Sequence, residues 1–147
     1  LKLCVVERHR NTGHIGVAFV QGYGLRHGAI ATSIAHDSHN IIVCGTNDAD
    51  IACAVNRIRA LEGGMVIVRG GAVLEELALP IAGLMCEDEP QHVAERLARL
   101  HQIARESGVP SEIDPFMTLS FAALPVIPAL KLTTRGVVDV ERFCLLS

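Results

Sequence analysis

Short apolar runs, separated by groups of turn residues, occupy the first third of the chain. Residues 3–8 and 15–20 are rich in β-branched side chains, and the polar residues 11–14 between them are typical of a turn. This pattern predicts a β-hairpin. Two further apolar runs, at 29–34 and 41–44, are predicted to be buried strands.

Apolar residues at 51–61 recur every three or four positions, which predicts an amphipathic helix. Residues 46–50 supply a capping side chain and carboxylates for its first turn, and a pair of glycines ends it. A second helix is predicted from Pro90 to Gly108, because proline is favoured in the first turn and glycine just beyond the last. Both helices should pack one apolar face against the strands.

The rest of the chain is less regular. Residues 65–69 and 72–77 flank a Gly-Gly turn and predict a second hairpin. The apolar residues 79–85 contain proline and glycine, so we expect a buried irregular stretch or a short turn of helix. We interpret 114–121 as a strand.

Hairpin-like strand pairs combined with two main helices predict an α+β (mixed α/β) fold, in which β-hairpins and a mixed sheet pack with the helices. The 147 residues suit a single domain, spanning 1–147. A chain of this length buries roughly 68–70% of its unfolded surface, so its core needs no disulfide or metal.

The composition narrows the classes of partner. Half of the residues are apolar, only 3% are aromatic, and the mean hydropathy is +0.36. This apolar excess predicts that one face is covered by another domain or subunit, and we expect a homo-oligomer. The 13 basic residues are scattered among 16 acidic ones, so no nucleic acid partner is expected.

Neither membrane insertion nor secretion is predicted. No apolar run approaches the roughly 18 residues of a membrane span, and we expect no signal peptide. The five cysteines, an odd number without CxxC spacing, indicate reduced thiols in a cytoplasmic protein. The chain starts in a strand without a Met, and we expect it to be a piece of a longer polypeptide.

The polar segment 36–40, His-Asp-Ser-His-Asn, lies between two predicted strands, where functional sites are common. His36, Asp37 and His39 are of the types that bind metals or transfer protons, so they are candidate catalytic and metal-binding residues. The alternative is that Asp37, Ser38 and Asn40 are turn residues bonded to the local backbone. The spacing leaves both interpretations open.

Glu7 and His9 form a second candidate pair, because side chains two residues apart on a strand share a face. Together with Asn40 they are candidate substrate-binding residues. The alternative is a surface ion pair between Glu7 and His9, which is the more common role of such a pairing.

Ordered segments along nearly the whole chain resemble the carboxy-terminal region of bacterial adenine deaminases, members of the amidohydrolase superfamily. The segments with this resemblance are 6–9, 12–16, 22–25, 28–31, 35–40, 45–48, 79–85, 114–121, 124–128 and 130–133.

The resemblance implies a hydrolase of purine salvage, which converts adenine and water to hypoxanthine and ammonia. It also implies manganese or iron held in an upstream (β/α)₈ barrel of about 250 residues, which is absent from this chain. None of the barrel's catalytic residues has a counterpart here. For this domain itself, the metal site that we expect is an accessory one at His36, Asp37 and His39.

Two hypotheses follow. In the first, the chain is a structural domain that shapes the active site of an adenine deaminase and is inactive alone. In the second, it is an independent metal- or purine-binding module that uses the segment 36–40. A complete hydrolase is disfavoured, because the residues supply no full set of base, metal and electrophile.

Overall fold

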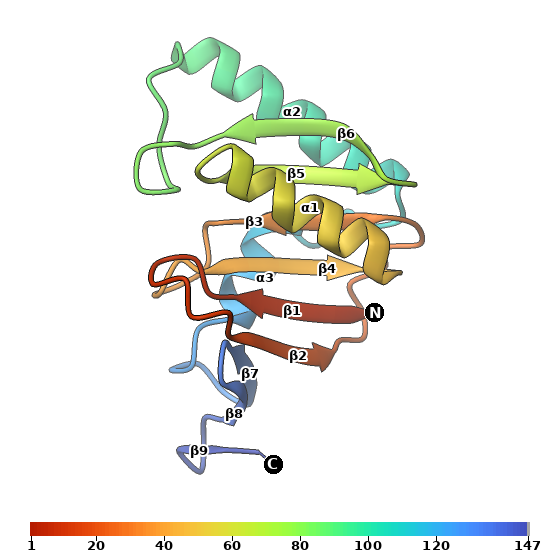
Figure 1. Cartoon of the computed structure of the whole chain (residues 1–147). Helices are drawn as coiled ribbons and strands as arrows, with labels where there is room; N and C mark the ends of the chain where they lie inside the picture. The colour runs from red at the N-terminus through yellow and green to blue at the C-terminus, as the bar shows by residue number, and fades with distance from the viewer. Residues whose placement is uncertain (147) are drawn as a thin grey trace.

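In the computed structural model, which describes residues 1–146, the chain forms two β-sheets and three helices (Figure 1). The strands of the larger sheet are β1 (Lys2–Val6), β2 (Ile15–Phe19), β3 (Ala29–Thr32), β4 (Ile41–Gly45), β5 (Gly64–Arg69) and β6 (Ala72–Ala78). The helices are α1 (Asp48–Ala60), α2 (Pro90–Glu106) and α3 (Pro115–Ala122), and the smaller sheet contains β7 (Leu130–Thr133), β8 (Gly136–Asp139) and β9 (Cys144–Leu145).

The larger sheet has the strand order β2-β1-β4-β3-β5-β6, and each of its neighbouring pairs is antiparallel. Both predicted hairpins, β1–β2 and β5–β6, are present, and the α+β class is confirmed. The hairpin β1–β2 pairs through β4 with the rest of the sheet, so Val5 lies opposite both Gly16 and Ile42. This register places the end of β1 beside the start of β4.

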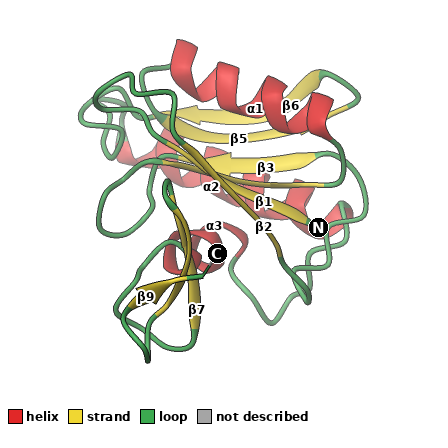
Figure 2. Cartoon of the chain, turned by 60° about the horizontal axis from the view of Figure 1, so that its bottom comes forward, coloured by secondary structure: helices red, strands yellow, loops and turns green. Residues whose placement is uncertain are grey.

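Helices cover the two faces of the sheet (Figure 2). On one face α1 buries Ile51, Ala54 and Ile58 against strand residues such as Val43 and Val66. The opposite face is covered by α2 and α3. Its core combines Leu100 and Ala104 of α2, Phe116 and Leu119 of α3, and Leu3, Val5, Ile30, Ile42, Cys44, Met65, Ile67 and Leu77 of the strands. β3 and β4 are buried on both faces, and apart from Thr32 at the end of β3 their sequences carry no polar side chain.

Local signals in the sequence determine the ends of the first helix. The side-chain oxygen of Asn47 accepts a 2.9 Å hydrogen bond from the backbone nitrogen of Asp50, as expected of an N-cap. The backbone nitrogen of Gly63 donates to the carbonyl oxygen of Ile58, and Gly63 has a φ of +136°. The predicted start and end of α1 are therefore confirmed, and α2 also agrees with the prediction.

The interpretation of 114–121 as a strand is wrong, because these residues form α3. The Asp114 carboxylate accepts hydrogen bonds from the backbone nitrogens of Phe116 and Met117, at 2.9 and 2.8 Å, and Pro115 occupies the first turn. This cap satisfies the free N–H groups of a helix start, which outweighs the strand preference of the aromatic residues.

The segment 79–85 is irregular, as predicted, but only part of it is buried. Leu79 belongs to the core, whereas Ile81 and Met85 pair with each other at the surface. Within residues 1–146, no helix is both long and apolar enough to cross a membrane.

The small sheet packs against the β1–β2 end of the large sheet, on the face that also carries α3. Leu132 of β7 reaches the core, and the backbone of Thr133 passes directly over Gly16 of β2. A side chain at position 16 would overlap the carbonyl oxygen of Thr133, so this approach requires glycine.

Candidate functional site

The segment 36–40, called here the HDSHN loop, connects β3 to β4, and residues 36–38 form a turn. The turn is closed by a 2.7 Å hydrogen bond from the backbone nitrogen of His39 to the carbonyl oxygen of Ala35. In return, the backbone nitrogen of Ala35 donates to Nδ1 of His39 at 3.3 Å. The loop is therefore ordered by its own contacts.

Arg8, just beyond β1, fixes the loop to the sheet. Its Nε donates to the carbonyl oxygen of His39 at 2.6 Å, and its backbone nitrogen donates to Oδ1 of Asn40 at 3.2 Å. The same guanidinium donates to the carbonyl oxygen of Ala82, in the turn after β6. One side chain thus joins three segments that are distant in sequence, although sequence analysis did not single it out.

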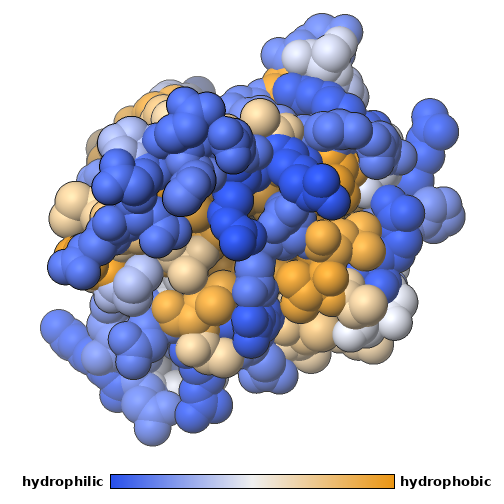
Figure 3. Space-filling view, turned by 90° about the horizontal axis from the view of Figure 1, so that it is seen from above, coloured by the Kyte–Doolittle hydropathy of each residue, from blue (hydrophilic) through white to orange (hydrophobic). Residues whose placement is uncertain are grey.

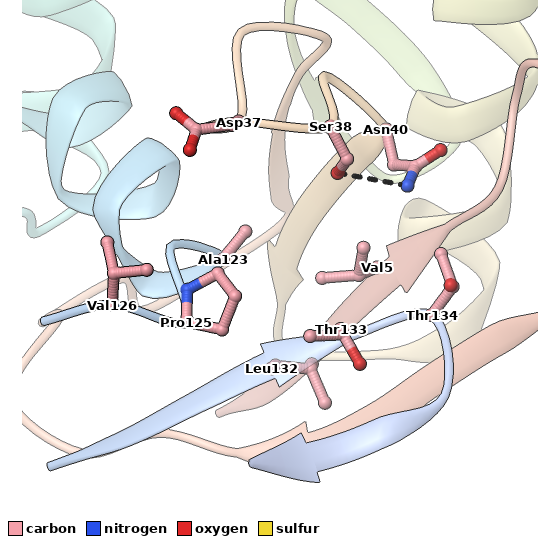
Figure 4. A pocket seen from close by; sticks show the side chains of 10 residues that line it. All are labelled: Val5, Asp37, Ser38, Asn40, Ala123, Pro125, Val126, Leu132, Thr133 and Thr134. Atoms are coloured by element: carbon pink, nitrogen blue, oxygen red, sulfur yellow. Dashed lines mark hydrogen bonds between the residues drawn. The ribbon is translucent and has the colours of Figure 1, made fainter. Parts of the chain in front are cut away.

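A cavity of about 440 Å³ lies beside the loop (Figure 4). Asp37, Ser38 and Asn40 line one side. The remaining walls come from three other parts of the chain, namely Val5 of β1, Ala123, Pro125 and Val126 after α3, and Leu132, Thr133 and Thr134 of β7 and its turn. The volume lies within the range of about 300–1,000 Å³ typical of small-molecule sites.

The polar side chains that line this cavity differ in whether they are free to bind a ligand. Asn40 is 8% exposed, and its amide nitrogen donates to Oγ of Ser38 at 3.1 Å while its oxygen accepts from Arg8. The carboxylate of Asp37 is exposed and forms no hydrogen bond or ion pair with any residue from 1 to 146. Asn40 therefore holds the loop in shape, and Asp37 is the charged group available to a ligand.

His36 and His39 do not line this cavity. Their rings meet edge to face with centroids 5.6 Å apart, and His36 packs 5.3 Å from the ring of Phe121 in α3. Partial burial, together with the neighbouring His36 and Arg8, lowers the pKa of His39 below its usual range. The surroundings of His39 thus favour the neutral form of its imidazole.

This arrangement does not fit a metal centre on this domain alone. The described residues contain no group of three or more His, Cys, Asp or Glu side chains placed to hold one ion. Nδ1 of His39 already accepts a backbone hydrogen bond, and Asp37 lies at the cavity rather than between the histidines. His36, Asp37 and His39 would need ligands from another chain or domain to bind a metal.

Glu7 acts within its own loop. One carboxylate oxygen accepts hydrogen bonds from the backbone nitrogens of His9 and Arg10, at 2.6 and 2.8 Å, and the other accepts from Thr12. The Nε2 atom of His9 contacts the carbonyl oxygen of Ser38 at 2.6 Å. His9 thus reaches the HDSHN loop, whereas the Glu7 carboxylate is occupied by the turn after β1.

The Glu7 carboxylate predicts a pH dependence of stability. Backbone hydrogen bonds, first from Thr12 and then from Arg10 and His9, lower the pKa of Glu7 from 4.5 to about 2. A carboxylate with a lowered pKa stabilises the fold above its unfolded pKa, and this contribution disappears as the pH falls from 4.5 toward 2.

Urea unfolding between about pH 6 and pH 2 measures this effect. We expect the Glu7→Gln variant to lose less stability than the wild type over the acid part of the range. Glu141→Gln, at an exposed carboxylate, serves as the control and should follow the wild type. Parallel curves for Glu7→Gln and the wild type would contradict the assigned role.

Fold and site together define an α+β domain whose polar loop forms one wall of a cavity. Residues 1–144 match the sequence model of the adenine deaminase C-terminal domain family, and the chain belongs to that family. It is 54% identical to an adenine deaminase of Nitratidesulfovibrio vulgaris (strain DP4), 52% to adenine deaminase 2 of Carboxydothermus hydrogenoformans and 51% to an adenine deaminase of Bacillus licheniformis.

Each of these alignments covers 97% of this chain but only 25% of the relative. The chain therefore spans about a quarter of the length of the adenine deaminases that it matches. The expected resemblance to the carboxy-terminal region of adenine deaminases is confirmed.

Proposed function

We propose that the chain serves as the carboxy-terminal domain of an adenine deaminase, in which it shapes the mouth of the active site and has no deaminase activity alone. One observation carries this proposal: the chain matches about a quarter of the length of proteins that are named adenine deaminase. The reaction itself, adenine and water giving hypoxanthine and ammonia, is proposed for the whole protein. Manganese or iron would be held outside this chain.

The chemistry of the HDSHN loop supports a shaping role. Its backbone and Asn40 are fixed by Arg8, and His39 is engaged with Ala35, so the loop presents a rigid surface. Asp37 and the His36 ring remain at its outer side, where they can contact a neighbouring domain or a bound purine. Such fixed polar groups position a substrate without transferring atoms themselves.

The decisive experiment is ammonia release from adenine by the purified 147-residue chain, with manganese or iron added. We expect no release above the uncatalysed background, whereas a full-length polypeptide carrying this domain should be active. Circular dichroism must show that the isolated chain is folded. Release that scales with the chain and disappears in His36→Ala would mean that the HDSHN loop is catalytic and that the proposal is wrong.

A second candidate function is that of an independent purine-binding module. The cavity of about 440 Å³ and the available carboxylate of Asp37 favour it. A carboxylate can accept hydrogen bonds from the amino or ring N–H groups of a purine. Calorimetric titration of the isolated chain with adenine distinguishes the two functions. Binding that is lost in Asp37→Asn but kept in Asp88→Asn, an exposed aspartate outside the cavity, would favour the module.

A further inference from the structure

β2, at one edge of the large sheet, exposes an apolar stripe. Ile15, Val17 and Phe19 are 55%, 51% and 82% exposed, and their alternation places all three on one face. Val17 lies opposite Cys4, which belongs to the core beneath α1. The stripe therefore extends the face that α1 covers elsewhere, while α1 itself lies over β3, β4 and β5 (Figure 1).

The outer backbone of β2 also lacks a hydrogen-bonded strand among residues 1–146, and its neighbours there, β7 and β8, contact it without pairing with it. Leu1 and Val20 exchange both of their backbone hydrogen bonds, at 3.0 and 2.9 Å. In an antiparallel pair, every second residue of a strand bonds to its neighbour and the residues between point the other way. Ile15, Val17 and Phe19 therefore direct their N–H and C=O groups away from β1. Within residues 1–146 these outward groups have no backbone partner. The same residues thus offer both an apolar surface and an unpaired strand edge.

The opposite edge of the sheet shows how an edge is normally protected. β6 carries Glu75, paired with Arg96 and Arg99, and Glu76, paired with Arg57. Viewed from that end, hydrophilic side chains cover much of the surface, with apolar patches between them (Figure 3). The sequence of β2, Ile-Gly-Val-Ala-Phe, contains no charge or proline, and its register with β1 has no bulge. Proteins avoid leaving such an edge free, because it pairs with other chains.

A groove continues the stripe toward α1. It has a volume of about 530 Å³ and lies between the ends of β1 and β2 and the helix, with Val6, Ile15, Val55 and Arg59 among its lining residues. A segment lying along β2 could place an apolar side chain in this groove.

The length of the relatives indicates what covers this edge. In the adenine deaminases that match, about three quarters of the chain lies outside the matched part, and the family is that of the C-terminal domain. In a polypeptide of that kind, the residue before Leu1 emerges beside Val20, at the Phe19 end of the stripe. The preceding part is thus tethered next to the open edge, at a high effective concentration.

We propose that an extended segment of the preceding part of the polypeptide pairs with the outer edge of β2 and covers Ile15, Val17 and Phe19. This interaction surface rests on the proposed function, since it requires the chain to work as one domain of a longer protein. The pairing would supply main-chain hydrogen bonds to β2, and the stripe would supply the buried apolar contact.

A cleavage experiment on the full-length polypeptide tests this surface. A protease site is introduced directly before Leu1, the protein is cleaved, and the fragments are followed by size-exclusion chromatography with light scattering. We expect the wild-type fragments to remain together. Val17→Lys should weaken their association by at least about tenfold, because a lysine on an edge strand opposes pairing. Val73→Lys, on the opposite edge strand β6, is the matched control and should leave the complex intact.

Amide hydrogen exchange gives a second measurement that does not depend on dissociation. The amides of residues 17 and 19 should be protected in the uncleaved wild type and, after correction of position 17 for the intrinsic rate of lysine, less protected in Val17→Lys. Association and protection that are unchanged in Val17→Lys would overturn the proposal. A halved particle mass in Val17→Lys, with the fragments still together, would assign the edge to a second copy and also overturn it. Neither result bears on whether the isolated chain deaminates adenine.

Discussion

Replacement of Gly16 by valine is expected to lower the free energy of unfolding by about 3 kcal/mol and to open the cavity beside the HDSHN loop. A Cβ atom at this position would overlap the carbonyl oxygen of Thr133 and press on the side chain of Leu132. Both are parts of β7 and also line the cavity. The two sheets must therefore separate to accommodate the valine.

Urea unfolding measures the loss of stability, and amide exchange at Leu132 and Thr133 reports whether β7 has moved. Ala72→Val, at an exposed position of strand β6, adds apolar volume without a clash and should change stability by less than about 0.5 kcal/mol. If Gly16→Val were as stable as Ala72→Val, the close packing of β7 on β2 would be refuted.

Replacement of Phe116 by alanine is expected to lower the free energy of unfolding by about 4 kcal/mol, since it removes a core aromatic ring and leaves a cavity. Phe116 is 3% exposed and lies in the core with Leu100 and Leu119. Its ring also lies 5.9 Å from that of His101. With Leu119 it packs α3 into the core, and α3 is the helix that carries Phe121 to the HDSHN loop.

Phe121→Ala provides the matched control, because it removes the same ring from the same helix at a site that is 40% exposed. We expect this control to cost less than about 1 kcal/mol in urea unfolding while freeing the His36 ring, which is visible as a changed His36 resonance. Equal destabilisation by the two substitutions would show that α3 does not pack as described.

The site was only partly predictable. The HDSHN loop and His9 were identified from residue types, and the structure places them together. The cavity was not predicted, because its walls come from β1, the residues after α3 and β7, which are distant in sequence. Arg8 was overlooked since an arginine between Glu7 and His9 gives no local signal, and its role depends on carbonyl oxygens of residues 39 and 82.

The sequence by itself determined the elements whose signals are local. The two hairpins, α1 and α2 follow from hydrophobic period, turn glycines and capping residues, and the family follows from ordered motifs along the chain. α3 was missed because its cap, Asp114, competes with an aromatic pattern that also suits a strand.

The tertiary structure alone decided how these elements meet. It places Asp37 at the cavity but turns His36 toward Phe121, and it leaves β2 with an open apolar edge. Such arrangements depend on close approach between residues far apart in the chain, as where Thr133 passes over Gly16. Hydrophobic pattern and turn chemistry fix each element, whereas packing of backbone on backbone fixes which side chains share a site.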